Sequence, residues 1–398
     1  MTYIKRLLGA HARKSLARGK SILLLGARQT GKTTFVHEEL QPDIEISFVS
    51  LVSRLRYEKN PELLEQEIQS ALSKFNRPPI IFIDEVQKIP AIMDSVQYII
   101  DNKWAQFILS GSSARKLKSG TEINLLPGRL VVFNLAPLTY QEIPAEDLNI
   151  EDLLIFGSLP GIILEHDLEN KELDLSSYVT TYLEDEIRTE SVVRNIGHLA
   201  QFLQVAAGES GKNCNMTKLS QDIGVAATTI SSYFQILVDC LIAHRVDPIT
   251  ETSTKRRLIS SVRYLFFDLG VRRVCANEGT KLPARLLGDL FEQYVGLQLL
   301  AYRDLNSRLA KLRYWRDSAG PEIDYVLEID RKYIPIEVKW SAAPTLQDAK
   351  HLTKFLQEYS NATEAYIVCR TPTEYILGAN NNIKVISWQQ LHTIFEND

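Results

Sequence analysis

The segment GARQTGKT, residues 26–33, is the feature of this chain that most restricts its fold. It fits the pattern G-x-x-x-x-G-K-S/T, in which the glycines let backbone N–H groups turn inward around phosphate oxygens. The apolar run 21–25 before it predicts a buried strand, and TTFVHEEL after it predicts a helix. A strand, a phosphate loop and a helix in this order predict an α/β domain that binds a nucleotide at the helix N-terminus.

The residues of the loop have separate chemical roles. Lys32 brings a positive charge to the β- and γ-phosphates, and the Thr33 hydroxyl binds Mg²⁺. The sequence therefore predicts ATP and Mg²⁺ as ligands. The predicted nucleotide-binding residues are Gly26, Ala27, Arg28, Gln29, Thr30, Gly31, Lys32, Thr33 and Thr34. The alternative is a glycine-rich turn without a ligand, which the flanking strand and helix disfavour.

An acidic pair after a buried strand follows in PPIIFIDEVQ, residues 78–87. The apolar run 80–83 is typical of a strand buried on both faces, and it ends in Asp84 and Glu85. In a parallel sheet, ligands bind beyond the carboxyl ends of the strands. We therefore expect Asp84 to hold Mg²⁺ through water and Glu85 to act as the general base that polarises the attacking water.

The spacing between the two motifs constrains the strand order. Between Lys32 and Asp84 the sequence has room for a strand at 44–52 and a helix at 61–75. The acid-bearing strand therefore need not lie beside the strand of the phosphate loop. That arrangement is typical of ATPases that use an additional catalytic glutamate.

Two further segments supply candidate catalytic residues. QFILSGSSAR, residues 106–115, reads as a buried strand, and it places Ser110 or Ser112 where a sensor of the γ-phosphate would lie. In LPGRL, residues 126–130, Arg129 precedes another strand. Arg129 could reach into the nucleotide site of a neighbouring subunit, or it could be an ordinary surface arginine.

Composition limits the partners of the chain. With 398 residues it has room for two or three domains, and its net charge of −4 excludes a basic nucleic-acid coat protein. Nucleic-acid contacts would need local patches, and two segments are rich in basic residues. These residues are Lys5, Arg6, Arg13, Lys14, Arg18, Lys20, Arg28 and Lys32 in the first, and Lys255, Arg256, Arg257, Arg263, Arg272 and Arg273 in the second. Solvated faces of helices and loops are the alternative for both patches.

The cysteines and the apolar runs bear on location. Four cysteines are scattered without a Cys-x-x-Cys pair, which favours a reducing compartment and argues against disulfides and zinc fingers. No apolar run reaches the roughly 18 residues that span a bilayer. The acid-free N-terminal segment resembles a transit peptide, but it leads directly into the strand that the phosphate loop requires. We therefore expect a cytoplasmic protein without a membrane segment.

The middle of the chain changes from strand-like runs to helical periodicity. Helices are predicted at 198–210, 216–224 and 225–242, followed by two strands around a basic loop. A helix, a helix–turn–helix and a hairpin in this order predict a winged helix. A helical lid that packs on the ATPase core or on another subunit is the alternative.

The predicted winged helix offers candidate DNA contacts. Thr228 and Thr229 would face the groove, and Lys255, Arg256 and Arg257 would touch phosphates. These groove-facing side chains are small and polar, which favours backbone contact over base readout. The predicted division of the chain is an AAA-like P-loop domain at 1–137, a helical lid or linker at 138–194, a winged helix at 195–275 and a restriction-endonuclease-like α/β domain at 276–398.

The last domain rests on the hairpin PEIDYVLEIDRKYIPIEVKW, residues 321–340. A two-residue turn at 330/331 or 331/332 places Asp324 opposite Glu337 or Lys339 on one face, with an apolar set on the other. Asp followed by Glu-x-Lys on a hairpin is the metal-site pattern of restriction-endonuclease-like nucleases, in which two carboxylates hold Mg²⁺ and the lysine steadies a hydroxide. Glu292, on a predicted helix at 288–300, would add a third acid. Ordinary cross-strand pairs on a solvated hairpin are the alternative.

The motifs together resemble a family. GARQTGKT, IIFIDEVQ, FILSGSSA, LPGRL, YWRDSAGPEIDYV and PIEVKW, in this order, resemble a bacterial and archaeal family of predicted AAA-type P-loop ATPases with a C-terminal domain of unknown function. The resemblance covers nearly the whole chain. It implies an α/β fold with an AAA-like core, a winged-helix middle and a nuclease-like C-terminal fold. It assigns nucleotide roles to Lys32, Thr33, Asp84 and Glu85, and nuclease-like roles to Glu292, Asp324, Glu337 and Lys339.

Three functions follow from these features. The first is an ATP-driven motor that remodels or translocates on DNA as a homo-oligomer such as a hexameric ring, since AAA-like sites usually need an arginine from a neighbour. The second is an ATP-gated, metal-dependent nuclease. The third is a nucleotide-switched signalling or regulatory scaffold that binds proteins. We favour the first, because the ATPase motifs are the most specific ones in the chain.

Overall fold

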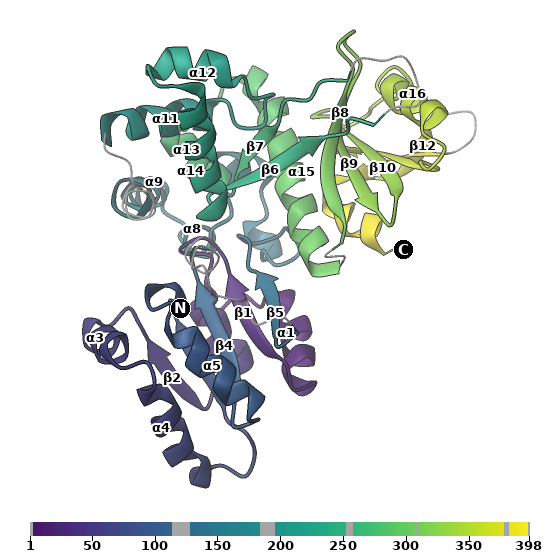
Figure 1. The fold of residues 1–398 in the computed structure, drawn as a ribbon. Coiled ribbons are helices and arrows are strands. Elements are labelled where there is room, and N and C mark those ends of the chain that lie inside the picture. Colours follow the sequence, from purple (N-terminus) through teal and green to yellow (C-terminus); the bar gives the residue numbers. More distant parts are fainter. Residues whose placement is uncertain are drawn as a thin grey trace.

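The computed structural model describes residues 3–113, 128–183, 196–251, 258–306, 309–377 and 382–396. Figure 1 shows a parallel sheet with its helices at the N-terminal end, a helical middle part, and a second sheet at the C-terminal end. The architecture is therefore α/β, as the sequence predicted. Within the described ranges, no helix has the length and apolar content needed to cross a membrane.

The N-terminal domain is a five-stranded parallel sheet in the order β2-β3-β4-β1-β5. Its strands are β1 (Ser21–Leu25), β2 (Ile44–Ser47), β3 (Ile80–Asp84), β4 (Gln106–Gly111) and β5 (Leu130–Asn134). The helices beside them are α1 (Leu8–Ala17), α2 (Lys32–Phe35), α3 (Leu51–Lys59), α4 (Leu63–Ala71) and α5 (Ile92–Asp101). Strand β1 is buried along its whole length, which explains its continuous apolar sequence.

The strand order confirms that the acid-bearing strand does not lie beside the strand of the phosphate loop. Strand β4 lies between β1 and β3, with Leu25 of β1 in register with Gly111 of β4. The three strands therefore end at one edge of the sheet. One expectation was too long: the strand predicted at 44–52 ends at Ser47, because Ser50 caps α3 by accepting from the Ser53 N–H at 3.4 Å.

The middle part is helical and ends in two strands. Its elements are α7 (Ile150–Phe156), α8 (Pro160–Leu164), α9 (Leu168–Ser177), η5 (Tyr178–Leu183), α11 (Ile196–Gly208), α12 (Met216–Ile223), α13 (Ala227–Asp239), β6 (Ala243–Pro248), β7 (Arg263–Phe266) and α14 (Leu269–Cys275). The helices and strands follow the order predicted for the winged helix, and Gly224 makes the turn after α12 with a φ of 76°. The cap of α12 is Asn215, which accepts from the Lys218 N–H at 3.0 Å.

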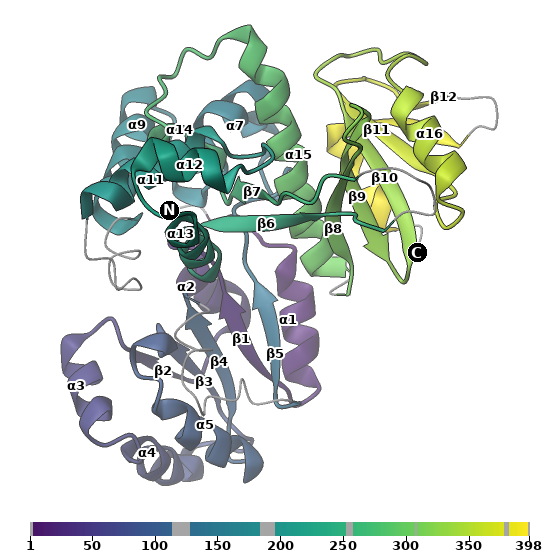
Figure 2. The same cartoon turned by 45° about the horizontal axis from the view of Figure 1, so that its top comes forward.

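The C-terminal part is built on an eight-stranded mixed sheet in the order β12-β13-β11-β10-β9-β8-β6-β7. It comprises α15 (Ala284–Asn306), β8 (Lys311–Arg316), β9 (Glu322–Ile329), β10 (Lys332–Val338), α16 (Lys350–Glu358), β11 (Ala365–Cys369), β12 (Tyr375–Leu377), β13 (Ile383–Ser387) and η6 (Trp388–Phe395). Figure 2 shows β6 running from the middle helices to the edge of β8. The middle and C-terminal parts therefore share one sheet.

The hairpin β9–β10 has one of the two predicted registers. Asp330 and Arg331, with φ of 46° and 68°, form the turn, and Tyr325 pairs with Ile336. Continuing this register by one residue places Asp324 opposite Glu337. The second face of the hairpin is not solvated, because Val326 on that face is fully buried in the core that includes residues of α16.

The segment between the two sheets belongs to the core of the C-terminal part. Leu138, Tyr140 and Leu153 are buried in the same hydrophobic cluster as residues of α15 and of the hairpin. The N-terminal domain is therefore attached to the C-terminal part by packed side chains as well as by the chain itself.

Several arginines of the two basic segments are buried. Arg6, Arg263, Arg272 and Arg273 are between 1% and 6% exposed. Their carboxylate partners are Glu142, Glu292 and Glu322, Glu278, and Glu172, respectively. For these four residues both expectations, nucleic-acid contact and a solvated face, were wrong. Arg6, Arg263 and Arg273 join segments that are far apart in the chain, whereas Glu278 lies only 6 residues after Arg272.

A glycine at the end of α7 tests how closely α7 packs against Asp268. Gly157 has a φ of 75°, and a Cβ atom there would lie 2.1 Å from Oδ1 of Asp268. We predict that Gly157→Ala lowers the free energy of unfolding by about 3 kcal/mol, because backbone strain adds to the displacement of a buried, hydrogen-bonded carboxylate. Chemical denaturation measures the change.

The matched control for that change is Gly224→Ala. Gly224 has nearly the same φ, 76°, but its ψ is 30° where that of Gly157 is −161°, and a Cβ atom there would meet nothing within 4 Å. This variant should lose only about 1 kcal/mol, the cost of the left-handed backbone. Equal losses in the two variants would contradict the role given to the Asp268 contact.

Candidate functional site

The phosphate loop joins β1 to α2 and has the geometry that its glycines allow. Gly31 has a φ of 89°, which favours glycine. At Gly26, a Cβ atom would lie 2.6 Å from the carbonyl oxygen of Leu135, so only glycine fits the close approach of the chain after β5. A cavity of about 300 Å³ opens at the loop. Its lining residues are Arg28, Gln29, Gly31, Lys32, Thr33, Thr34, Val49, Asp84, Glu85 and Lys88.

Lys32 is buried at the base of this cavity. Its Nζ donates to the carbonyl oxygens of Gly26 at 2.8 Å and Ala27 at 2.9 Å. The amine is thus held over the loop, on the side where phosphates would bind.

The two predicted Mg²⁺ ligands lie side by side. The Thr33 hydroxyl donates to Oδ2 of Asp84 at 3.3 Å, and the Ser110 hydroxyl donates to Oδ1 of the same carboxylate. Asp84 is only 7% exposed. Hydroxyl and carboxylate oxygens are the hard donors that Mg²⁺ prefers, so these residues fit the ion.

Glu85 is held beside them in an unusual backbone conformation. Its φ is 58°, and its Oε2 accepts from Nε2 of Gln87 at 2.6 Å and from the Ser112 hydroxyl at 3.3 Å. Sequence reasoning had not assigned Gln87 a role, although it stands two residues after Glu85 in a motif already singled out. Ser110 contacts Asp84 and Ser112 contacts Glu85, so both candidate sensors lie at the site.

Arg129 lies at the end of the sheet opposite the phosphate loop, where the strands begin. The next residue, Leu130, is in register with Ser21 at the start of β1, whereas the phosphate loop follows the end of that strand. Arg129 forms a bidentate pair with Asp101, at 2.5 and 3.0 Å. It does not reach the site of its own chain, and its role toward a neighbouring subunit stays a prediction.

Behind the phosphate loop, Arg6 connects the loop to the segment that follows β5. Its guanidinium donates to the carbonyl oxygens of Thr30 at 2.9 Å and Ala136 at 2.6 Å, and it pairs with Glu142 at 3.1 Å. These contacts join three segments far apart in the sequence at one buried cation.

The segment after β5 in turn contacts α15. The Tyr140 N–H donates to Oε1 of Gln298 at 3.2 Å, and the Tyr302 hydroxyl donates to Gln141 at 2.9 Å. A cavity of about 120 Å³ lies between the phosphate loop and α15, and residues of the loop and of the helix line it. The same helix carries Glu292, about 9 Å from Gln298 along the axis.

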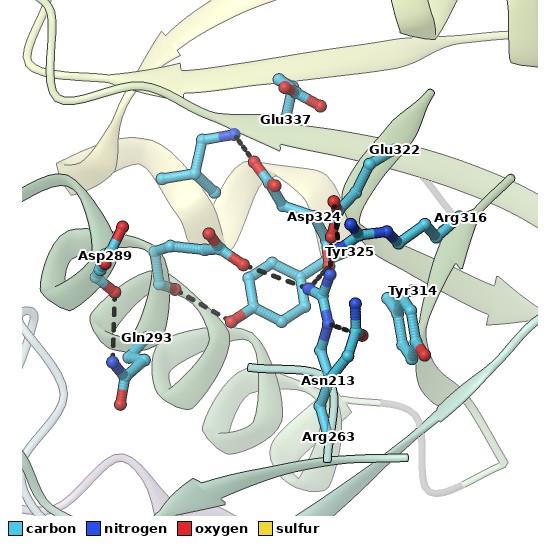
Figure 3. Close-up of polar contacts among 12 residues, drawn as sticks. Asn213, Arg263, Asp289, Gln293, Tyr314, Arg316, Glu322, Asp324, Tyr325 and Glu337 are labelled. Carbon is cyan, nitrogen blue, oxygen red and sulfur yellow. Dashed lines mark hydrogen bonds and ion pairs between the residues drawn. The ribbon is translucent and has the colours of Figure 1, made fainter. Parts of the chain in front are cut away.

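The carboxylates predicted for the nuclease-type site come together at the other side of α15. Figure 3 shows Glu337 and Asp324 on neighbouring strands, with Arg263 approaching from β7. Oδ2 of Asp324 accepts from the Val338 N–H at 2.8 Å, and Oε1 of Glu337 accepts from Nζ of Lys339 at 2.6 Å. Glu292 accepts from Arg263 at 3.2 Å. We call Glu292, Asp324 and Glu337 the carboxylate cluster.

Burial and mutual repulsion raise the pKa values of the cluster. Loss of solvation, followed by the negative charge of Asp324, raises the pKa of Glu337 to about 8 and that of Glu292 to about 8. Burial also raises the pKa of Asp324. The cluster therefore holds protons more tightly than exposed carboxylates would.

The cluster has an open ligand position but not a formed metal site. Oε2 of Glu337 is buried and has no hydrogen-bond partner among the residues that the structure describes. Within those residues, no group of three or more His, Cys, Asp or Glu side chains is arranged to hold a metal ion. Glu292 is held by Arg263 and one oxygen of Glu337 by Lys339, which accounts for the incomplete arrangement.

Comparison with known proteins places the N-terminal domain. Residues 18–144 match a family model described as an AAA domain. This match places an AAA-type P-loop domain at the N-terminal end of the chain. Residues 147–281 and 287–391 match two models described as domains of unknown function, DUF8612 and DUF4143.

Two relatives and one solved structure are similar to the chain. Uncharacterized protein Rv2008c of Mycobacterium tuberculosis and uncharacterized protein Mb2031c of Mycobacterium bovis are each 25% identical to it over 347 residues, covering 86% of this chain and 75% of theirs. The structure of the Walker-type ATPase of Pyrococcus abyssi matches with a TM-score of 0.50 and 13% identity, covering 69% of this chain and 96% of that one. At this identity the likeness concerns the fold.

Only two of the predicted DNA contacts, Thr228 and Thr229, lie within the residues that the structure describes. Thr228 is exposed and Thr229 half-exposed at the start of α13, a helix that carries no lysine or arginine. Lys255, Arg256 and Arg257 lie outside the described residues. The exposed face of α13 therefore offers hydroxyl groups rather than charge.

The carboxylate cluster predicts a pH dependence of stability. The pKa of Glu337 in the folded state, about 8, lies above the ordinary value of 4.5, so Glu337 binds its proton more tightly in the folded state. This contribution is complete below pH 4.5 and is lost as the pH rises toward 8. Glu337→Gln, which cannot ionise, should therefore become more stable relative to the natural protein as the pH is raised from about 5 to about 9. Denaturation at several pH values measures this difference, and a constant difference would contradict it.

Proposed function

We propose that this protein hydrolyses ATP with Mg²⁺ and, as a homo-oligomer, uses the energy to remodel DNA or to move along it. The observation that carries the proposal is the convergence of Lys32, Asp84 and Glu85 on one cavity at the phosphate loop. Their side chains come from the end of β3 and the N-terminus of α2, an arrangement that suits phosphoryl transfer.

Each residue of the site has a place in the reaction. Lys32 would bind the β- and γ-phosphates, and Thr33 with Asp84 would hold Mg²⁺. When bound, Mg²⁺ neutralises charge on the phosphate oxygens. Glu85 would accept a proton from the attacking water, and Gln87 and Ser112 would keep its carboxylate in position through the hydrogen bonds described above.

The nucleotide state would reach the C-terminal part through packed and hydrogen-bonded contacts. The first link is Arg6, between the phosphate loop and the segment 134–143. The second is the contact of Tyr140 with Gln298 on α15, the helix that carries Glu292. A shift of the phosphate loop on ATP binding would thus move α15 through its contact at Gln298. All three functions considered from the sequence need such a connection.

DNA as the substrate is supported by the order of the middle elements. A helix–turn–helix followed by a hairpin places the start of α13, with Thr228 and Thr229, on the surface. Hydroxyl groups and backbone N–H groups at a helix N-terminus bind phosphates without reading bases. This supports contact with the DNA backbone irrespective of sequence.

The general base gives the first test of hydrolysis. Glu85→Gln should lower the rate of ATP hydrolysis by about 100-fold or more, because a positioned base contributes about that factor, while ATP binding persists. The matched control is Glu45→Gln on β2 of the same sheet, whose side chain is exposed and pairs with His37 at 2.9 Å. Hydrolysis that survives in Glu85→Gln would contradict the assigned role.

A second pair of variants tests the oligomer. Arg129→Ala should abolish most ATP hydrolysis if the guanidinium completes the site of a neighbour, because such an arginine contributes about 1,000-fold or more. Arg77→Ala is the control, since Arg77 also forms a bidentate pair with an aspartate, Asp43, at 2.8 and 2.9 Å on the surface of the same domain. Loss in neither variant would remove Arg129 from the reaction.

A second candidate function is a metal-dependent nuclease. It is favoured by the approach of Glu292, Asp324 and Glu337, and by the unpartnered Oε2 of Glu337. In this function the cluster would hold a divalent cation, and Lys339 would steady an attacking hydroxide.

One experiment separates these functions. ATP hydrolysis is measured without DNA and with single-stranded, duplex and branched DNA, and the same Mg²⁺ reactions are run on gels. We expect stimulation by one DNA form that declines as salt rises. Cleavage that Asp324→Asn abolishes, and that Asp289→Asn on α15 does not, would support the nuclease. Hydrolysis indifferent to every DNA, without cleavage, would instead favour the regulatory scaffold.

A further inference from the structure

Arg263 is the most heavily bonded side chain of the carboxylate region. It comes from β7, an edge strand of the mixed sheet, and is only 3% exposed. Its guanidinium lies 4.1 Å from the ring centre of Tyr314 and donates from Nε to Asn213 at 3.0 Å. Nη1 donates to Glu292 at 3.2 Å, and Nη2 donates to Glu322.

The contacts of Arg263 cross between parts of the protein. Asn213 and Arg263 belong to the middle part, whereas Glu292 and Glu322 belong to α15 and β9 (Figure 3). Nη1 also donates to the carbonyl oxygen of Asp324 at 3.4 Å. The guanidinium of the middle part is therefore inserted directly beside the carboxylate cluster.

The charges explain why a cation is needed there. Among the described residues bonded at this place, the carboxylates are Glu292, Glu322, Asp324 and Glu337, and the cations are Arg263, Arg316 and Lys339. With all four carboxylates ionised, as metal binding requires, the groups other than Arg263 carry a formal net charge of −2, which is the charge that a divalent metal ion balances. Buried carboxylates without a counter-ion are strongly destabilising.

The space beside Arg263 allows it to leave. A polar cavity of about 550 Å³ lies between the segment 208–213 and α15 and is lined by Arg263, Glu292 and Glu322. The other members of the cluster, Asp324 and Glu337, do not line it. Arg263 therefore lies between this cavity and the carboxylates of Asp324 and Glu337.

We infer that Arg263 is an internal cation that competes with a divalent metal ion for the carboxylate cluster. While Arg263 is inserted, it holds Glu292 away from Asp324 and Glu337. When Arg263 moves out toward the cavity, Glu292 becomes free to bind the metal together with Oε2 of Glu337, which has no hydrogen-bond partner among the described residues. The inference rests on the second candidate function, the metal site, and adds its control by the middle part.

Mn²⁺ titration of the full-length, nucleotide-free protein tests this inference. Calorimetry measures the affinity in the natural protein, in Arg263→Met and in Asn213→Ala. The part of the binding that is lost on adding Glu337→Gln belongs to the cluster. We expect Arg263→Met to raise the Mn²⁺ affinity at least about tenfold. Asn213→Ala changes no charge but frees one side of the guanidinium, and it should raise the affinity about threefold.

Arg316→Met is the matched control. Arg316 pairs with Glu322 at 3.0 Å, and the variant removes the same charge from the same region without freeing Glu292. Its Mn²⁺ affinity should stay within about threefold of the natural protein. An equal gain in Arg316→Met and Arg263→Met would overturn the inference, because charge alone would then explain the effect.

The remaining outcomes separate the inference from the function on which it rests. Equal Mn²⁺ affinity in the natural protein and in Arg263→Met, removed by Glu337→Gln, would overturn the competition and leave the metal site standing. No Mn²⁺ binding in any variant would overturn both. Thermal unfolding checks that each variant is folded, and if Arg263→Met is not, Asn213→Ala decides alone.

Discussion

Buried guanidinium groups are the interaction on which the arrangement of this protein depends. Arg6 joins the phosphate loop to the segment after β5, Arg273 joins α14 to Glu172 of α9, and Arg263 joins β7 to the carboxylates of α15 and β9. Removing one partner of a buried ion pair costs about 3–5 kcal/mol, so each contact stabilises the arrangement in which its partners meet. An arginine also presents its donors in a rigid planar fork, so it can satisfy several acceptors at once in a defined geometry. The parts of the chain are therefore joined at a few defined points.

The sequence predicted those features that local patterns determine. The phosphate loop is restricted by its glycines, and Asp84 and Glu85 by the buried strand before them. The pleat limited the hairpin to two registers, both of which keep Tyr325 and Ile336 on one face, and the structure has the register in which these two residues pair. In each of these places the side-chain pattern repeats with the period of one strand or one helix turn, so a short window contains the information.

Features that depend on distant contacts could not be predicted. Arg263 and Arg273 read as a basic surface because their carboxylate partners Glu292 and Glu172 lie 29 and 101 residues away in the chain, on elements whose approach no local pattern reveals. Glu278, the partner of Arg272, lies only 6 residues away. The union of β6 with β8 is hidden for the same reason. Gln87 was missed although it stands in a motif already recognised, because its partner Ser112 becomes a neighbour only when β3 and β4 pair.

We expect the nucleotide site and the carboxylate region to respond to each other through Arg6, the segment 134–143 and α15. Hydrogen–deuterium exchange of the full-length Glu85→Gln protein, with and without Mg²⁺ and ATP, measures this response. ATP should change the exchange of peptides covering 134–143, α15 and the β9–β10 hairpin, together with those of the phosphate loop. Changes confined to residues 26–34 and 84–88 would contradict it, because the nucleotide would then be bound without any effect on the C-terminal part.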